Sequence, residues 1–269
     1  MASDSLCRTT RRWISFSPGS ARPSSERRQC SCRSEGDTAM TGDPALLTLL
    51  QFADGLFPAG GFAHSFGLET YVQDGRVRDR QGLEAFIAAH LEGSAGPADA
   101  AAVALAVRLS ARADTEDWLA LDARLDAMKS IPEFRTASRQ MGRQSLRIAA
   151  GLGDDVFLAH LARAVDDERS AGHHATVFGA IVGRGGAGPE PAAAAYLYAT
   201  AALLVGAGLR LIALGQLDGQ RVLAAMRVRI ERLAAAAARA TADDLWSFNP
   251  ALELAGIRHA TLDMRLFRS

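Results

Sequence analysis

The amino-acid sequence predicts an all-α fold, a single-domain bundle of about ten helices over residues 41–269. Three observations support this prediction. Helix-starting residues recur along the chain, β-branched residues nowhere alternate in period two over the length of a strand, and residues 192–209 carry no charge. Hydrophobic residues make up 48% of the 269 residues and charged residues 22%, a composition that can form a sizeable core.

Capping residues and prolines mark where the predicted helices begin. Asp43-Pro44 opens the first helix, because aspartate is a favoured N-cap and proline suits the first helical position; this helix ends at Asp54-Gly55. Ser65 is predicted to cap a short second helix that ends near Gly75. Later helices are predicted to start at Asp79, Gly96-Pro97, Asp114, Pro132, Asp154, Ala175, Asp218 and Leu252.

The uncharged segment 192–209 has two interpretations. Its length, about eighteen residues, reaches the lower limit for a membrane span. A buried central helix of a bundle is also hydrophobic on every side. Alanine and glycine dominate the segment and Arg210 follows it directly, so we favour the buried helix and predict no membrane association.

Residues 1–40 differ in composition from the rest of the chain. They are rich in serine and arginine and contain no apolar stretch typical of a signal peptide. We expect a disordered tail or a gene-model extension ahead of Met40, and consider a transit peptide the weaker alternative. All three cysteines, Cys7, Cys30 and Cys32, fall here, so the rest of the chain suits a reducing cytosol and we predict a cytoplasmic protein. The Cys30–Cys32 pair alone is weak evidence for a metal site.

Neither the charge nor the motifs indicate catalysis or nucleic-acid binding. The 30 basic and 30 acidic residues balance, which removes the electrostatic argument for nucleic acid. Residues 41–269 contain no phosphate-binding loop, no G-x-S-x-G motif and no cysteine nucleophile, so we predict no catalytic residue and no cofactor. Among the six histidines, His90 and His160 are predicted at the surface or rim, and His173-His174 in capping or packing rather than metal binding.

The segment Asp54–Glu69 concentrates unusual residues, and we call it the signature segment. Gly60-Gly61 permits backbone angles that are closed to other residues, and Phe62 lies in the short loop that follows. Glu69 falls in the first turn of the next helix, where a carboxylate is favourable. The segment could be a buried turn between helices, but its density of glycine, proline, aromatic and acidic residues suggests a recognition element.

Three motifs in this order resemble the urease accessory protein UreF family. Phe57-Pro-Ala-Gly-Gly-Phe-Ala-His-Ser-Phe-Gly-Leu-Glu69 resembles the family signature F-P-x-G-[GSA]-[FY]-x-[HY]-S-x-G-L-E. Gly172-His-His-Ala-Thr-Val-Phe-Gly179 is similar to its mid-chain glycine/histidine stretch, and Met264-Arg-Leu-Phe-Arg-Ser269 to its R-L-[FY]-x-S ending. The resemblance covers residues 45–269.

The resemblance implies a non-enzymatic scaffold. Family members are all-helical, form twofold dimers, and bridge UreD (also called UreH) and the GTPase UreG, so that nickel reaches apo-urease. Nickel would be handled only transiently, without a resident metal site. The partner-binding residues that it implies are Phe57, Pro58, Gly60, Gly61, Phe62, His64, Ser65, Gly67, Leu68, Glu69, His174, Arg265, Leu266, Phe267 and Ser269.

The sequence departs from some relatives at Phe62, where they have tyrosine. A hydroxyl hydrogen bond from this position to the tail, Met264–Ser269, is then unavailable, and Arg265 must find another acceptor. We further expect the tail to be disordered until UreD binds.

Two other functions stay open. The chain could be a helical metal-dependent hydrolase that uses His64, His173, His174 and Glu69. It could instead regulate the GTPase UreG directly through an inserted arginine, although the sequence does not single one out.

Overall fold

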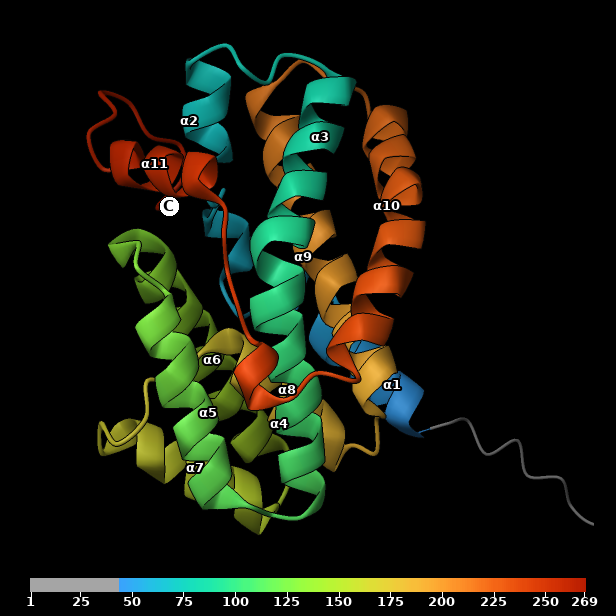
Figure 1. Cartoon of the computed structure of the whole chain (residues 1–269), viewed down its shortest axis with the longest axis vertical. Coiled ribbons are helices and arrows are strands. Elements are labelled where there is room, and N and C mark those ends of the chain that lie inside the picture. The colour runs from blue at the N-terminus through green and yellow to red at the C-terminus, as the bar shows by residue number, and fades with distance from the viewer. Residues whose placement is uncertain (1–43) are drawn as a thin grey trace, which may run out of the picture. The chain divides into compact units, whose positions relative to one another are not determined.

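The computed structural model describes residues 44–269. Predictions about residues 1–40 and the cap at Asp43 lie outside this range. The described chain consists of helices and their connections, with no strand between residues 44 and 269, which confirms the all-α prediction (Figure 1). The α-helices are α1 (Pro44–Ala53), α2 (Leu68–Gln73), α3 (Arg80–His90), α4 (Ala101–Ala111), α5 (Thr115–Met128), α6 (Pro132–Leu152), α7 (Val156–Asp166), α8 (His174–Arg184), α9 (Pro189–Leu211), α10 (Gln216–Ala237) and α11 (Pro250–His259).

The core forms where α4, α8, α9 and α10 pack together. α4 lies along α8, and α9 packs against α10, α4 and α8. Small residues allow α4 and α8 to approach each other closely, since a Cβ at Gly179 of α8 would collide with the backbone of Val103 in α4. The interior side chains, such as Leu197, Leu204 and Met226, are fully buried. Alanine and glycine in these helices therefore bring backbones together and leave the larger side chains to fill the space between them.

Helix α9 is the uncharged segment of the sequence. Within residues 44–269 it is the single helix long and apolar enough to cross a membrane, and half of its most apolar window is buried inside the structure. Ala192, Ala201 and Leu204 have no exposed surface. These neighbours explain the absence of charge and support the prediction of a central bundle helix.

Several predicted helix starts agree with the structure. The side chains of Asp79 and Asp114 accept hydrogen bonds from Gly82 N and Asp117 N, as capping residues do, and Pro132 is the first residue of α6. Four starts are shifted: α8 begins at His174 rather than Ala175, α11 begins at Pro250 rather than Leu252, and the starts of α7 and α10 also differ. Asp155, not Asp154, caps α7 through Leu158 N, and α10 is preceded by Gly215, so that Asp218 lies in its first turn.

The predicted break at Gly96-Pro97 was wrong. A π-helical stretch, Leu91–Ala100, joins α3 to α4 and contains Pro97 (Figure 1). Proline normally interrupts an α-helix because it lacks a donor and its ring meets the preceding turn. The wider π-turn relieves both conflicts, so the chain continues from Arg80 to Ala111 without a loop.

Buried Asp122 fixes the start of α8 against α5. Its carboxylate has no exposed surface and accepts four hydrogen bonds. Two come from the backbone N–H groups of Gly172 (2.9 Å) and His173 (2.9 Å), and two from the hydroxyls of Ser170 (2.6 Å) and Thr176 (2.6 Å). The carboxylate therefore satisfies N–H groups that precede the first turn of the helix and have no intrahelical partner.

Replacing Asp122 with asparagine is expected to lower the free energy of unfolding by about 2 kcal/mol, because one acceptor oxygen becomes a donor that faces other donors. Urea denaturation followed by circular dichroism measures the change. Asp117→Asn, on the exposed side of the same helix, is the matched control and should change the stability by less than about 0.5 kcal/mol. Equal midpoints for the two variants would contradict the assignment.

Candidate functional site

The signature segment folds as a compact loop between α1 and α2. The Phe57 ring packs on Phe52 of α1, with ring centroids 4.8 Å apart. Gly60 adopts a φ of +89°, in the left-handed region that favours glycine, and a 3₁₀ turn, Gly61–Ala63, follows. At Gly61 an added Cβ would lie 2.7 Å from Leu203 of α9, so the loop backbone lies directly on that helix.

Ser65 does not cap α2 as predicted. Gly67, with a φ of +85°, precedes the first helical residue, Leu68. The Ser65 hydroxyl instead donates to the main-chain oxygen of Ser269 (2.9 Å), while Glu69 N reaches the same hydroxyl at 3.4 Å. The serine is therefore not the N-cap residue of α2, but its hydroxyl connects the tail to the first turn of that helix.

The tail is ordered against the signature segment, so the expectation of disorder was wrong. The main-chain oxygen of Ser269 accepts hydrogen bonds from Ser65 N and from Phe66 N (3.0 Å), and Arg268 N donates to Ala63 O (2.8 Å). His64 Nδ1 lies 2.8 Å from the Ser269 hydroxyl. These main-chain hydrogen bonds form within this chain and do not require a partner protein. They explain why Ser269 is buried.

Glu69 is the main anchor of the tail. Its carboxylate is 2% exposed and accepts hydrogen bonds from Leu266 N (2.7 Å) and Phe267 N (3.1 Å). His259 of α11 places Nε2 3.0 Å from Glu69 Oε2 and Nδ1 2.6 Å from Glu133 Oε2. The buried imidazole thus bridges two carboxylates, one on α2 and one on α6. The predicted place of Glu69 at the start of α2 is confirmed, and its side chain serves the tail.

Arg265 uses Glu133 as its acceptor in this sequence, where position 62 has no hydroxyl. Its Nη1 lies 3.1 Å from Glu133 Oε1, and the side chain is 42% exposed. Because Glu133 also contacts His259, the cation of the tail is coupled to the buried anchor. The pair itself lies at the surface, where ion pairs add little stability, so Arg265 has charge available for a partner.

Arg210 of α9 joins loop and tail at a second place. Its Nη2 donates to the carbonyl of Phe62 (2.7 Å), and its guanidinium carbon lies 4.2 Å from the centre of the Phe267 ring. Burial lowers the pKa of Arg210, although the guanidinium stays protonated at neutral pH. The Phe267 ring is buried, so this contact is a second connection between loop and tail besides that of Glu69.

The predicted partner-binding residues fall into three groups, apart from His174, which is half-buried against Tyr196 of α9. Phe62, Leu266 and Arg265 have substantially exposed side chains, with Phe62 at 72% and Leu266 at 62%. The buried members His64, Ser65, Glu69, Phe267 and Ser269 hold the loop and tail together, and Leu68 belongs to the hydrophobic core. Phe57, Pro58, Gly60, Gly61 and Gly67 shape the loop. Two further apolar side chains, Leu56 and Met264, are exposed at 90% and 81% beside the predicted ones.

The histidines proposed for hydrolysis lie in separate surroundings. His64 contacts Ser269, whereas His173 Nε2 lies 2.8 Å from Asp126 Oδ1. His174 packs its ring against Tyr196, with centroids 5.5 Å apart. Within residues 44–269 no group of three or more His, Cys, Asp or Glu could hold a metal ion. The geometry gives the hydrolase alternative no assembled site.

Burial sets the protonation of several of these histidines. It lowers the pKa of His64 to about 4, with a contribution from the nearby Arg268 charge, and lowers that of His90 to about 4. The pKa of His173 is also lowered by burial.

His90 was predicted at the surface or rim and is buried instead, at 8% exposure, because its helix continues into the π-helical stretch inside the bundle. His160 is exposed as predicted.

Sequence reasoning missed Glu133, His259 and Arg210. Glu133 reads as an ordinary acid in the first turn of α6, and His259 as the end of a polar helix. Arg210 carried the only usable signal, since it directly follows a long uncharged segment. Their roles depend on contacts between residues far apart in the chain.

Fold and site together define an all-helical protein whose signature loop is fixed to its own tail, and both segments carry exposed apolar side chains, with the exposed Arg265 on the tail. The model of the family described as UreF matches residues 77–227, a range that contains neither the signature segment nor the tail. The chain therefore belongs to the UreF family of urease accessory proteins, and the match to the family model does not depend on the signature segment or the tail.

The chain aligns with several curated relatives over nearly the whole length of each relative. Urease accessory protein UreF from Rhizobium leguminosarum bv. trifolii is 37% identical over 238 residues, covering 86% of this chain and 100% of that protein. The protein of the same name from Granulibacter bethesdensis is 37% identical over 236 residues, covering 86% and 97%. That from Bacillus sp. is 30% identical over 224 residues, covering 83% and 99%.

Proposed function

We propose that this protein is a non-enzymatic scaffold for urease maturation, which bridges UreD (UreH) and the GTPase UreG so that nickel enters apo-urease. The observation that supports this most is the exposed surface around the loop–tail junction. Phe62, Met264 and Leu266 present apolar side chains there, while buried bonds to Glu69 and Ser65 hold the backbone beneath them. A surface that is already ordered loses little conformational entropy on binding.

The proposal also includes a homodimer in the cytoplasm, without a resident cofactor. Nickel would pass as cargo of the assembly. Light scattering of the purified protein, alone and with UreD, tests the dimer; a strict monomer in both samples would contradict that part.

Leu266→Asp is expected to weaken co-purification with UreD and UreG by at least about tenfold, because it places an unpaired charge on the proposed apolar surface. Leu217→Asp is the matched control, since that leucine is 63% exposed on α10 and Leu266 is 62% exposed. Pull-down with purified partners and quantitative immunoblotting provides the readout. Equal recovery for both variants would refute the assignment of this surface.

Arg265→Ala and a deletion of Arg265–Ser269 are expected to abolish co-purification with UreD and UreG, for different reasons. The point variant removes an exposed charge and should keep the fold, because the pair with Glu133 lies at the surface. The deletion also removes the buried residues Phe267 and Ser269 and should expose Glu69. Circular dichroism separates loss of fold from loss of binding. Intact assembly in both variants would exclude the tail from the partner surface.

A further inference from the structure

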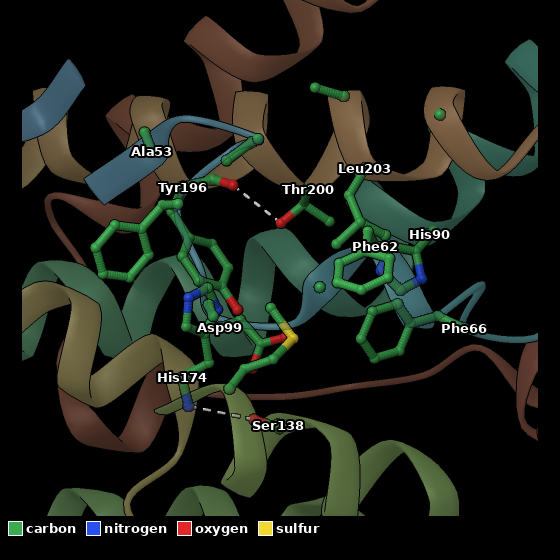
Figure 2. Close-up of a pocket in the computed structure, with 18 of the residues that line it drawn as sticks. Ala53, Phe62, Phe66, His90, Asp99, Ser138, His174, Tyr196, Thr200 and Leu203 are labelled. Carbon is green, nitrogen blue, oxygen red and sulfur yellow. Dashed lines mark hydrogen bonds between the residues drawn. The ribbon is translucent and has the colours of Figure 1, made fainter. Parts of the chain in front are cut away.

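A cavity of about 490 Å³ lies beneath the signature segment. Its walls come from the end of α1, the loop, α3, the π-helical stretch, α6 and α9 (Figure 2). Binding sites for small molecules in proteins have volumes of about 300–1,000 Å³, with mostly apolar walls and a few polar groups. The cavity has this size, and the scaffold function proposed above does not use it.

One part of the cavity wall is aromatic. Phe66 and Phe134 meet edge to face with ring centroids 5.7 Å apart, and Phe62 and Phe57 reach the wall from the loop. Leu203 and Met141 also line the cavity. Such a wall favours a flat ring, which gains contact area and aromatic contacts at small entropic cost.

The charged side chains of the cavity wall balance in number, with two basic residues, Lys129 and Arg210, and two acidic ones, Asp99 and Asp54. Lys129 Nζ lies 2.7 Å from Asp99 Oδ1, so the two charges compensate each other. Burial lowers the pKa of His90 and of His174 to about 4, and it raises the pKa of Tyr196, so these three side chains are neutral at physiological pH. Arg210 already donates to Phe62 O and Asp54 already accepts from Leu56 N, so the wall has no net charge, which favours an uncharged ligand.

His90 supplies a polar atom that lacks a partner. Its Nδ1 is buried and has no hydrogen-bond partner in the structure, and the residue is 8% exposed. His90 lines the cavity near Phe62 and Phe66 (Figure 2). A neutral imidazole nitrogen is a donor in one tautomer and an acceptor in the other. A hydroxyl group can serve either tautomer, because it both donates and accepts.

We propose that this cavity is a binding site for a small uncharged aromatic molecule with a hydroxyl group, of the phenol class. The ring lies among the phenylalanines, and the hydroxyl meets His90 Nδ1. The proposed binding is non-covalent and does not require a metal ion.

Calorimetric titration with phenol tests the proposal, with toluene and benzoate as comparison ligands. We expect saturable binding of one phenol per chain with a dissociation constant of about 1 mM or below. Toluene should bind at least about fivefold more weakly for lack of the hydroxyl, and benzoate should not bind. Absence of saturable phenol binding up to about 10 mM, or equal affinity for phenol and toluene, would overturn the proposal.

Gly206→Leu locates the site. Gly206 lines the cavity on α9, and an added Cβ meets no atom within 4 Å, so leucine should occupy the cavity without disturbing the helix. Gly151→Leu is the matched control, because that helical glycine also has open space but lies outside the cavity. Phenol binding should fall at least about tenfold in the first variant alone, with both melting temperatures at or above that of the parent. Unchanged binding in Gly206→Leu would place phenol elsewhere and refute the site.

His90→Phe tests the hydrogen bond. It keeps a ring of similar size and removes the unpartnered nitrogen, so the preference for phenol over toluene should disappear while toluene binding persists. A preference that survives this change would overturn the role of His90. If neither ligand binds but Gly206→Leu weakens recovery of UreD, the cavity accepts a side chain of a protein partner, and the small-molecule proposal fails.

Discussion

Replacing Glu69 with alanine is expected to lower the free energy of unfolding by about 4 kcal/mol, because it leaves three buried donors without an acceptor. Two are the backbone N–H groups of Leu266 and Phe267, and the third is the His259 imidazole. His259 would still contact Glu133, so part of the bridge survives. The tail should detach from the loop and become sensitive to protease before the rest of the chain.

Urea denaturation and limited proteolysis measure these two effects of Glu69→Ala. Glu69→Gln keeps one acceptor oxygen and should cost about 2 kcal/mol, roughly half as much. Glu84→Ala is the matched control, because Glu84 forms only a surface pair with Arg80 and should contribute less than about 0.5 kcal/mol. If Glu69→Ala differs from this control by less than about 1 kcal/mol, the carboxylate is not the anchor of the tail.

Local patterns were sufficient to predict much of the fold. The caps at Asp79 and Asp114 and the proline at the start of α6 act within one helical turn, so the sequence around them contains the whole interaction. The central position of α9 follows from its lack of charge. Pro97 could not be predicted in this way, because a π-turn around proline is stable only when neighbouring helices hold it, and α3, α4, α9 and α10 all pack against that stretch.

The candidate site was predictable where a residue belongs to a motif and unpredictable where it acts as a distant partner. Glu69 and Arg265 lie in the motifs. Nothing in the sequence around either residue indicates that Glu69 contacts His259 or that Arg265 contacts Glu133. The structure brings α2, α6, α11 and the tail together at these four side chains. Ion pairs between residues more than a hundred positions apart have no local signature in a single sequence.

The expectation of a disordered tail failed for a related reason. A short polar segment is usually mobile unless it is tied down, and the residues that tie this one are buried in the signature segment. Ser65, Phe66 and Ala63 use backbone groups, which are present at every position and cannot be recognised from residue type. The ordered tail changes the expected binding mechanism, since a partner would meet a formed surface and need not fold it.

Phenylalanine at position 62 leaves the connection between loop and tail to other groups. Arg210 binds the carbonyl of Phe62 and stacks on Phe267, and neither contact needs a hydroxyl at position 62. The aromatic ring is then free to lie at the surface, where its outer part can meet a partner while its inner part lines the cavity. Ligand in the cavity and partner on the surface would share this one side chain.

Lowering the pH from 7.5 to 5 is expected to reduce the free energy of unfolding by about 4 kcal/mol through His64 and His90 alone. Each has a pKa near 4 in the folded protein and an ordinary value of 6.5 when unfolded. Because the folded pKa lies below the unfolded one, the unfolded chain takes up protons first as the pH falls. The stability is therefore complete above about pH 6.5 and is lost progressively toward pH 4, at about 2 kcal/mol per histidine by pH 5.

Urea denaturation at intervals between pH 7.5 and 5 measures this loss, and two variants divide it. His90→Phe should remove about 2 kcal/mol of the loss, because it eliminates one buried imidazole and leaves His64 and His174 in place. His160→Gln, which replaces an exposed histidine on α7, is the matched control and should reproduce the parent profile. A flat profile in the parent would mean that both buried imidazoles can be protonated without cost, which is incompatible with the enclosed positions of His90 beneath the signature segment and of His64 against Ser269.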